Sequence, residues 1–346
     1  MSGSQQKGIN KSGIENTRNA RIVFMGTPEF AIPSLDALLI NKLNVAGIVT
    51  SPDRQSGRGL KLQQSAVKKF AKKYSLPVLQ PTNLKDREFI NELKKIKPDL
   101  LVVVAFRKLP DEVWQLPPLG TINLHASLLP QYRGAAPINW VLINGEKTTG
   151  VTTFFIDDKI DTGKIIYQDK VEITPGENAG TLHDKLMSKG AKLVIKTVKS
   201  ILEGVSPQTD QSTLTKPQIE LKKAPKLRSE NCDIPWGKSA VEVYNFIRGL
   251  SPYPGAWTKI KNQKGKVSIL KIFETEAIPE KHEHKPGTIL TDDQSYLKVA
   301  ADSGFVKLLS VQLPGKKQMD IIPFLRGFDT DGLRFDVEEE LSKLSE

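Results

Sequence analysis

The chain has 346 residues, of which 38% are hydrophobic and 26% charged, and its formal net charge is +11. This length suggests two domains, since a domain usually holds roughly 100–200 residues, and the composition excludes a disordered or fibrous protein. The longest apolar run, LLVVVAF (100–106), is too short to cross a bilayer, and the single cysteine, Cys232, excludes an internal disulfide framework. We therefore expect a protein of the reducing cytoplasm without a membrane segment.

Strands and helices alternate in the first part of the sequence. Residues 1–20 are polar and lack the apolar stretch of a secretory signal, so we expect a flexible tail. Strands are predicted at 21–26, 45–50 and 100–106, with helices following Pro28 and at 64–74 and 86–97. Strands that are apolar on both faces belong to a parallel sheet covered by helices on both sides. The pattern predicts a doubly wound α/β domain.

The chain then changes character twice. After a strand at 121–126 we expect a helix at 136–144, strands at 151–156 and 164–173 joined by a turn, and a helix at 181–202 capped by Gly180-Thr181. A polar linker follows, and beyond it a helix at 240–250 and short strands broken by Gly and Pro indicate a small β-barrel. We place the α/β domain at 21–205, the linker at 206–228 and an OB-like β-barrel domain at 229–346.

Basic residues gather in two stretches of the sequence. Eight basic residues stand against one acid between Lys42 and Lys73, and twelve against four acids between Lys216 and Lys271, whereas the chain is acidic from Asp329 onward. Clustered positive charge favours a polyanionic partner such as a nucleic acid. A solvated, lysine-rich surface is the alternative that charge alone leaves open.

Asn123 and His125 end the predicted strand 121–126. Open α/β sheets bind ligands outside the carboxyl ends of their strands, and residues two apart on a strand point to the same face. Histidine is a suitable acid or donor near neutral pH. A buried, hydrogen-bonded histidine beside an asparagine that caps the next turn is the alternative, and these two residues alone do not decide between them.

A stiff loop and an acidic turn follow this pair. The loop SLLPQYRGAAP (127–137) contains two prolines and a glycine, which fix more of its backbone than a passive connection needs. The turn at 157–163 contains three aspartates, of which Asp161 is placed to point back at the imidazole, whereas Asp157 and Asp158 suit the turn itself. The sequence therefore predicts a site built from Asn123, His125 and Asp161.

Four motifs together resemble the methionyl-tRNA formyltransferases, a family of folate-dependent formyltransferases. They are RIVFMGTPEFAIPSLDALL (21–39), SPDRQSGRG (51–59), INLHASLLPQYRGAAPI (122–138) and IDTG (160–163). SLLPxYRG preceded by Asn-x-His is the specific part of this signal, whereas GTPEF alone is weak. The resemblance extends from about Arg21 into the C-terminal domain.

The resemblance implies a catalytic trio and a donor. Asn123 and a protonated His125 would donate hydrogen bonds to the oxyanion that develops when a formyl group leaves 10-formyltetrahydrofolate, the co-substrate. Asp161 would hold the ring, favour its protonated form and relay the proton of the attacking amine. No metal is required, and the sequence contains no HExxH or CxxC pattern.

The folate is expected at Phe106, Arg107, Lys108 and Leu109 and at Ser127, Leu128, Leu129 and Pro130. Many members of the family read AYGxxLP in the first segment, whereas this chain reads AFRKLP (105–110), one residue shorter and with Arg107 in place of a small residue. This departure leaves the shape of the pterin pocket open. We expect backbone groups of 106–109 to bind the pterin edge.

The acceptor implied by the family is the α-amino group of methionine on initiator tRNA, a step that supports translation initiation. The two basic stretches then have a polyanion to bind, and we expect contacts from Arg58, Lys61, Lys222, Lys223, Lys226 and Arg228. Phosphate contacts of this kind give affinity without sequence readout. We further expect the protein to act as a monomer.

Other functions are weighed against this one. The same chemistry could serve glycinamide ribonucleotide, an amino sugar nucleotide or water, and an inactive tRNA-binding protein could keep the fold as a scaffold. A nicotinamide dehydrogenase is disfavoured because GTPEF lacks the spaced glycines of a dinucleotide loop. His282 and His284 are expected at the surface, His183 in a structural role, and Cys232 as a lone thiol.

Overall fold

A computed structural model describes residues 19–56, 61–215, 220–261, 266–327 and 334–335. They form two compact units. Unit 1 contains the described residues up to Arg133 together with Thr149–Val171 and His183–Lys222. Unit 2 contains Gly134–Thr148, Glu172–Leu182 and the described residues from Lys223 onward. The domain limits expected at 205/206 and 228/229 stay a prediction.

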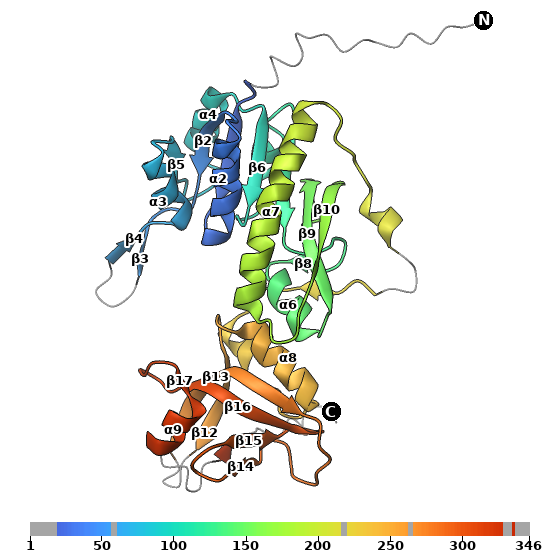
Figure 1. Cartoon of the computed structure of the whole chain (residues 1–346). Coiled ribbons are helices and arrows are strands. Elements are labelled where there is room, and N and C mark those ends of the chain that lie inside the picture. Colours follow the sequence, from blue (N-terminus) through green and yellow to red (C-terminus); the bar gives the residue numbers. More distant parts are fainter. Residues whose placement is uncertain (1–18, 57–60, 216–219, 262–265, 328–333, 336–346) are drawn as a thin grey trace, which may run out of the picture. The chain divides into compact units, whose positions relative to one another are not determined.

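Unit 1 is organised around a seven-stranded sheet with the order β10-β9-β7-β6-β1-β2-β5 (Figure 1). Its strands are β1 (Ile22–Gly26), β2 (Val45–Val49), β5 (Val78–Leu79), β6 (Leu100–Val104), β7 (Thr121–His125), β9 (Thr148–Phe155) and β10 (Ile165–Glu172). The strands from β7 to β5 in this order pair in parallel, and β9 is antiparallel to β7. The predicted, mostly parallel sheet is confirmed, because β1 and β6 are fully buried runs that only a sheet covered on both faces can use.

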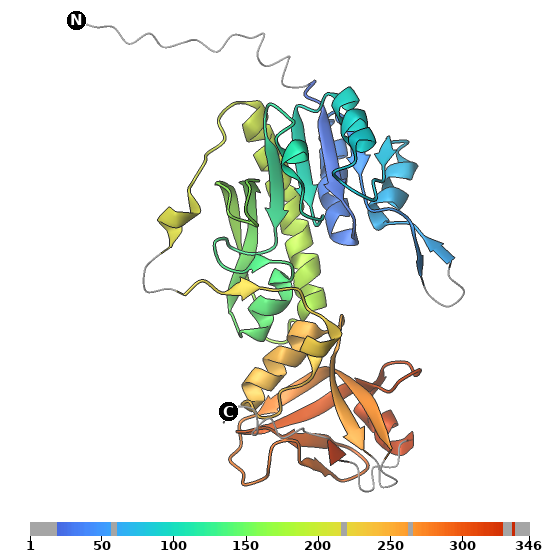
Figure 2. The same ribbon diagram turned by 180° about the vertical axis from the view of Figure 1, so that it is seen from behind.

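Helices cover both faces of this sheet. The helical elements are the 3-10 turn η1 (Glu29–Ala31), α2 (Ile32–Ile40), α3 (Ala66–Lys73), α4 (Arg87–Ile96), α5 (Asp111–Trp114) and α7 (Ala179–Leu202). One face packs against α4 and α5 through a cluster that contains Val23, Leu93 and Val113. On the opposite face, α7 lies along the sheet beside α2, as the two views show (Figures 1 and 2). The sequence pattern therefore predicted the layers and the main elements, but not the short strand β5 or the short helix α5.

Two local expectations need correction. Asn178 is the residue that precedes α7, and its Oδ1 accepts a hydrogen bond from the Thr181 backbone at 3.0 Å. Thr181, one of the two expected cap residues, takes part in this cap, because its Oγ1 accepts from the Asn178 backbone at 3.1 Å. The helix begins at Ala179 for this reason. Strands β3 (Arg54–Ser56) and β4 (Lys61–Gln63) form an antiparallel hairpin that the sequence pattern did not predict. The predicted tRNA contact Arg58 lies outside the described residues.

Unit 2 contains an antiparallel half-barrel with the order β14-β15-β16-β13-β12-β18, in which β17 also pairs with β16. Its strands are β12 (Ala256–Lys261), β13 (Val267–Ile278), β14 (Ile289–Thr291), β15 (Leu297–Ala300), β16 (Phe305–Gln312), β17 (Met319–Asp320) and β18 (Arg334–Phe335). The helices of this unit are α6 (Pro137–Ile143), α8 (Ala240–Leu250) and α9 (Ile321–Gly327). The predicted class of a β-rich C-terminal domain is confirmed.

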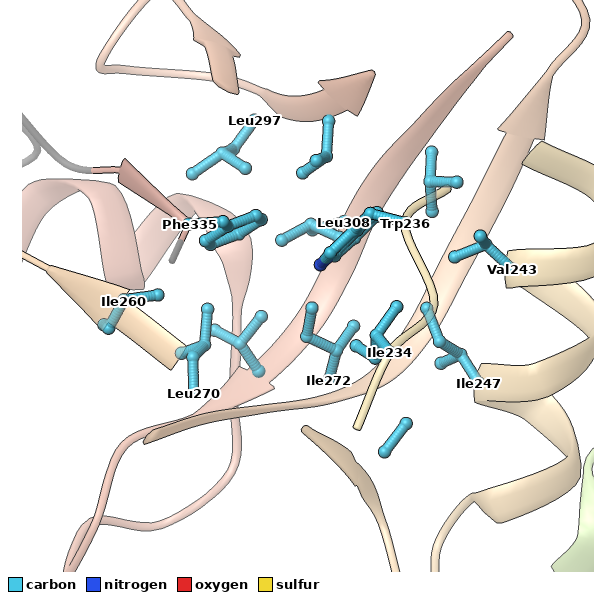
Figure 3. Close-up of a cluster of buried hydrophobic side chains, with 14 of the residues drawn as sticks. Ile234, Trp236, Val243, Ile247, Ile260, Leu270, Ile272, Leu297, Leu308 and Phe335 are labelled. Carbon is cyan, nitrogen blue, oxygen red and sulfur yellow. The ribbon is translucent and has the colours of Figure 1, made fainter. Parts of the chain in front are cut away.

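The core of unit 2 gathers around Trp236 (Figure 3). This ring is 2% exposed, stacks on Phe335 with centroids 5.3 Å apart, and its Nε1 donates to Thr258 Oγ1 at 3.1 Å. Helix α8 begins with a capping box between Ser239 and Glu242, which satisfies donors that the first helical turn leaves open. Among the described residues, no helix combines the length and apolar character needed to cross a membrane.

Candidate active site

Asn123 and His125 lie at the carboxyl end of β7, as predicted. His125 is 6% exposed, whereas Asn123 is half-buried. The Asn123 side chain forms no hydrogen bond within the described part of the chain, which leaves its amide available to a ligand. Because the two residues are two positions apart on one strand, both side chains address the same space.

The His125 ring is fixed by a hydrogen bond at one nitrogen. Its Nε2–H donates to the Tyr132 carbonyl oxygen at 2.9 Å, because a carbonyl oxygen can only accept, and this leaves the other nitrogen, Nδ1, for a second partner. Nδ1 lies 3.8 Å from Oδ2 of Asp161, whose side chain is 14% exposed. The structure thus brings the three predicted catalytic residues to one place, with the carboxylate of Asp161 facing Nδ1 of His125.

Asp161 lies in a tight turn between β9 and β10. Its φ is +57°, a left-handed conformation that Asp adopts more readily than most residues. Two residues later, a Cβ on Gly163 would lie 1.7 Å from the Phe155 carbonyl oxygen, so only glycine fits there. Asp157 accepts hydrogen bonds from Thr162 Oγ1 at 2.7 Å and from the Lys159 backbone at 3.2 Å, which confirms its predicted use as a turn residue.

Gln211 is a member of this site that the sequence did not reveal. It belongs to a short 3-10 turn, η2 (Gln211–Leu214), and is 3% exposed. Its Nε2 donates to the carbonyl oxygens of Asp161 at 2.9 Å and Gly163 at 2.8 Å, and its Oε1 accepts from Arg133 Nε at 3.1 Å and from a terminal nitrogen of the same side chain at 2.6 Å. A glutamine in a polar linker does not by itself indicate a functional site. Of its partners, Arg133 belongs to the YRG part of a motif that the sequence did reveal.

The loop that follows β7 is fixed by hydrogen bonds to its neighbours. Ser127 is fully buried and its hydroxyl donates to the Gln131 carbonyl oxygen at 2.6 Å. Thr152 Oγ1 accepts from the Leu129 backbone at 3.1 Å and donates to the Ser127 carbonyl oxygen at 2.6 Å. Leu129 packs with Phe154 and Ile165. Ser127, Leu129 and Pro130 are therefore buried and Leu128 is half-buried, and a folate contact from this loop stays a prediction.

The predicted folate segment 106–109 borders an open pocket of about 740 Å³. The pocket is lined by residues 82–85, Arg87 and 107–112, so three of the four predicted residues line it: Arg107, Lys108 and Leu109. Arg107 donates to the carbonyl oxygens of Thr82, at 2.8 Å, and Pro81. Its guanidinium also lies 5.6 Å from the centroid of the half-buried Phe106 ring. The arginine that departs from the family pattern thus ties this segment to the loop at 81–82.

Four predicted tRNA contacts, which we name the linker cations, are Lys222, Lys223, Lys226 and Arg228. All four are exposed. Lys222 also has a backbone role, since its carbonyl oxygen accepts from the Tyr132 backbone at 2.7 Å. Lys61 lies at the start of β4. Lys68, in the same basic stretch, forms an ion pair with Asp53 at 2.7 Å, so its charge is not among the solvated positive charges of this stretch.

The remaining histidines and the cysteine lie apart from this site in the sequence. His183 is partly exposed, bonds to Asp184 at 2.9 Å and packs edge-on against Phe30. His284 is exposed as expected, but His282 is half-buried, because its Nε2–H donates to the Gly304 carbonyl oxygen and its ring packs on Phe305. Cys232 is 1% exposed, and burial raises the pKa of its thiol.

Known proteins match this chain over both units. The family model "Formyl transferase" matches residues 20–198, and "Formyl transferase, C-terminal domain" matches residues 226–329. A methionyl-tRNA formyltransferase of Bacteroides fragilis is 52% identical over 308 residues, which cover 89% of this chain and 95% of that protein. One of Flavobacterium johnsoniae is 51% identical over 307 residues, which cover 89% and 96%.

A solved structure shares the fold at lower identity. It is an N-formyltransferase of Helicobacter canadensis in complex with folinic acid and dTDP-3-aminofucose. Its TM-score is 0.58 at 20% identity, and the match covers 84% of this chain and 98% of that one.

Proposed function

The chain belongs to the methionyl-tRNA formyltransferase family, and from this premise we propose that it moves a formyl group from 10-formyltetrahydrofolate to the α-amino group of methionine on initiator tRNA. The observation that carries the proposal is the approach of Asp161 to within 3.8 Å of His125 Nδ1, beside Asn123. Formylation of this aminoacyl-tRNA supports translation initiation.

The reaction is an acyl transfer between two nitrogens. The amine nitrogen attacks the formyl carbon, a tetrahedral centre forms, and the bond from that carbon to N10 of the folate breaks while a proton passes from the amine to N10. Negative charge develops on the formyl oxygen during attack, and hydrogen-bond donors placed there lower the barrier. The chain therefore has to supply donors and a route for one proton.

Three side chains meet these needs. The Asn123 amide is an N–H donor with no protein partner among the described residues. The His125 ring uses Nε2–H on the Tyr132 carbonyl oxygen, so Nδ1 is the nitrogen that faces Asp161. The Asp161 carboxylate orients this ring and would pass the amine proton onward.

We place the folate donor against the segment 106–109 and the loop at 127–130. The 740 Å³ pocket beside the segment 106–109 supports this placement, because its lining has four cations, Lys85, Arg87, Arg107 and Lys108, against two acids, Asp111 and Glu112, and this excess of positive charge suits the carboxylates of a folate tail. Backbone groups of 106–109 would recognise the pterin edge, and the buried loop at 127–130 would act by shaping the site. The solved relative from Helicobacter canadensis binds folinic acid, which supports a folate here.

We place the tRNA along the linker cations, Lys61 and Arg58. The linker cations are exposed, and cations of this kind bind phosphates without reading sequence and supply the part of the affinity that depends on salt. We further propose a monomer that works in the cytoplasm, divided at 205/206 and 228/229 into a catalytic domain, a linker and a tRNA-binding domain. The single cysteine of the chain supports the reducing compartment.

The test is the formation of formyl-methionyl-tRNA by the purified full-length chain. We expect activity with 10-formyltetrahydrofolate and charged initiator tRNA, and a loss of about 100-fold or more in kcat for His125→Ala and for Asp161→Asn. Asp158→Asn, in the same turn, serves as the matched control and should retain activity. Wild-type activity in either catalytic variant would overturn the residue roles.

A second assay tests the acceptor. The chain is incubated with the same donor and either charged initiator tRNA or an amino sugar nucleotide, the class of molecule bound in the solved relative. We expect formylation of the tRNA alone. Turnover of the amino sugar without turnover of the tRNA would show that the same reaction serves a small acceptor. Tight, salt-dependent tRNA binding with no turnover would indicate an inactive scaffold.

A further inference from the structure

The backbone just before Gln211 is fixed by pairing with β10. Gln211 follows a two-residue pairing in which the backbones of Thr209 and Ile165 exchange hydrogen bonds at 2.8 and 2.9 Å. This pairing joins the segment to the start of β10, and the Gln211 side chain is then 3% exposed. The polar atoms of a buried amide need hydrogen-bond partners within the protein, so the partners of Gln211 indicate what its side chain does.

The hydrogen-bond partners of the Gln211 side chain determine which end of the amide is the oxygen and which is the nitrogen. Arg133 donates two hydrogen bonds to Oε1, and a guanidinium has no acceptor for an N–H, so the nitrogen end must face away from it. The two protons of Nε2 are directed at the carbonyl oxygens of Asp161 and Gly163, at 2.9 and 2.8 Å. Gln211 therefore holds the turn at two points on either side of Thr162.

The held turn carries a strained residue whose position matters for chemistry. Asp161 has a φ of +57°, and a non-glycine residue in this region persists only where its surroundings impose it. Gln211 binds the backbone of Asp161, so it sets where the residue stands without using the carboxylate that faces His125. A displacement of about 1 Å at such a group costs roughly 100-fold in rate.

We propose that Gln211 is a positioning residue for formyl transfer, which holds Asp161 against His125 through the backbone of the turn and is itself oriented by Arg133. The inference rests on the proposed function of this site. It assigns a positioning role to a residue that lies between the two matched regions, which end at residue 198 and begin at residue 226.

The informative variant is Gln211→Glu. Glutamate keeps the size of the side chain and gives Arg133 a carboxylate, so the segment should stay folded, but it has no N–H for the two carbonyl oxygens. We expect kcat to fall about 10- to 100-fold while KM for charged tRNA stays within about 2-fold. Ser212→Ala, at the exposed neighbouring position, is the matched control and should match the wild type.

A double-mutant cycle separates positioning from general support. If Gln211 acts through Asp161, then Gln211→Glu should cost less than about 2-fold when added to Asp161→Asn, because the carboxylate it positions is already gone. Equal losses in both backgrounds, or wild-type kcat in Gln211→Glu, would overturn the inference. A wild-type chain that forms no formyl-methionyl-tRNA would instead overturn the proposed function, so the two failures are distinct.

Discussion

Gly163→Ala is the sharpest small perturbation that the structure offers. The added Cβ would lie 1.7 Å from the Phe155 carbonyl oxygen and 2.9 Å from its carbon, both in the backbone of β9. Real Cβ atoms do not approach closer than 3.0 Å, so the turn must move by at least 1.3 Å. A backbone strand cannot rotate out of the way as a flexible side chain would, and the turn carries most of the displacement.

The displacement reaches Asp161, two residues away, and breaks the geometry of the Gln211 bonds to both carbonyl oxygens. Overpacking of this kind costs about 1–3 kcal/mol of stability, and a shift of about 1 Å at a catalytic group costs roughly 100-fold in rate. We therefore expect a folded variant with a slightly lower melting temperature and a kcat reduced about 100-fold.

The assay measures the initial rate of formyl-methionyl-tRNA formation at saturating donor, well below the melting temperature found by circular dichroism. Gly237→Ala is the control, because a Cβ at Gly237 meets nothing within 4 Å. A Gly163→Ala variant with both the kcat and the melting temperature of the wild type would refute the steric argument. A variant of unchanged kcat and lowered melting temperature would refute the link from this turn to catalysis.

Three further predictions concern other parts of the chain. Hydrogen bonds from Gln80 and Lys68 hold the pKa of Asp53 below its ordinary 3.8. Asp53→Asn should therefore lower the free energy of unfolding above pH 3.8, and the difference from wild type should vanish as the pH falls below the folded pKa. Cys232, buried and with a raised pKa, should resist iodoacetamide in the native protein and react on unfolding, and rapid native labelling would contradict its burial. Changing the linker cations to alanine should raise KM for tRNA at constant kcat and reduce the salt slope of tRNA binding by up to about 0.9 for each phosphate that the variant no longer binds. An unchanged slope would exclude these residues from the interface.

Patterning in the sequence predicted much of the fold because its signals are local. Fully apolar strands such as 100–104 can only be buried on both faces, and the helices between them follow from periodicity and caps. The placement of Asn123 and His125 on one face also follows, since two residues apart on a strand is a local relation. The hairpin of β3 and β4 was missed because its short, polar strands have no apolar alternation to reveal them.

By itself the sequence determined the two-part organisation, the motifs and the identity of the three residues proposed to carry out the reaction. Tertiary structure alone decided how those residues are held. The Tyr132 carbonyl oxygen accepts from Nε2–H of His125 and so fixes which ring nitrogen faces Asp161, and Gln211, 50 positions along the chain from Asp161, binds its backbone. Hydrogen bonds between distant residues depend on how the chain returns on itself, and no periodicity, cap or composition encodes a buried amide whose partners lie so far away in sequence.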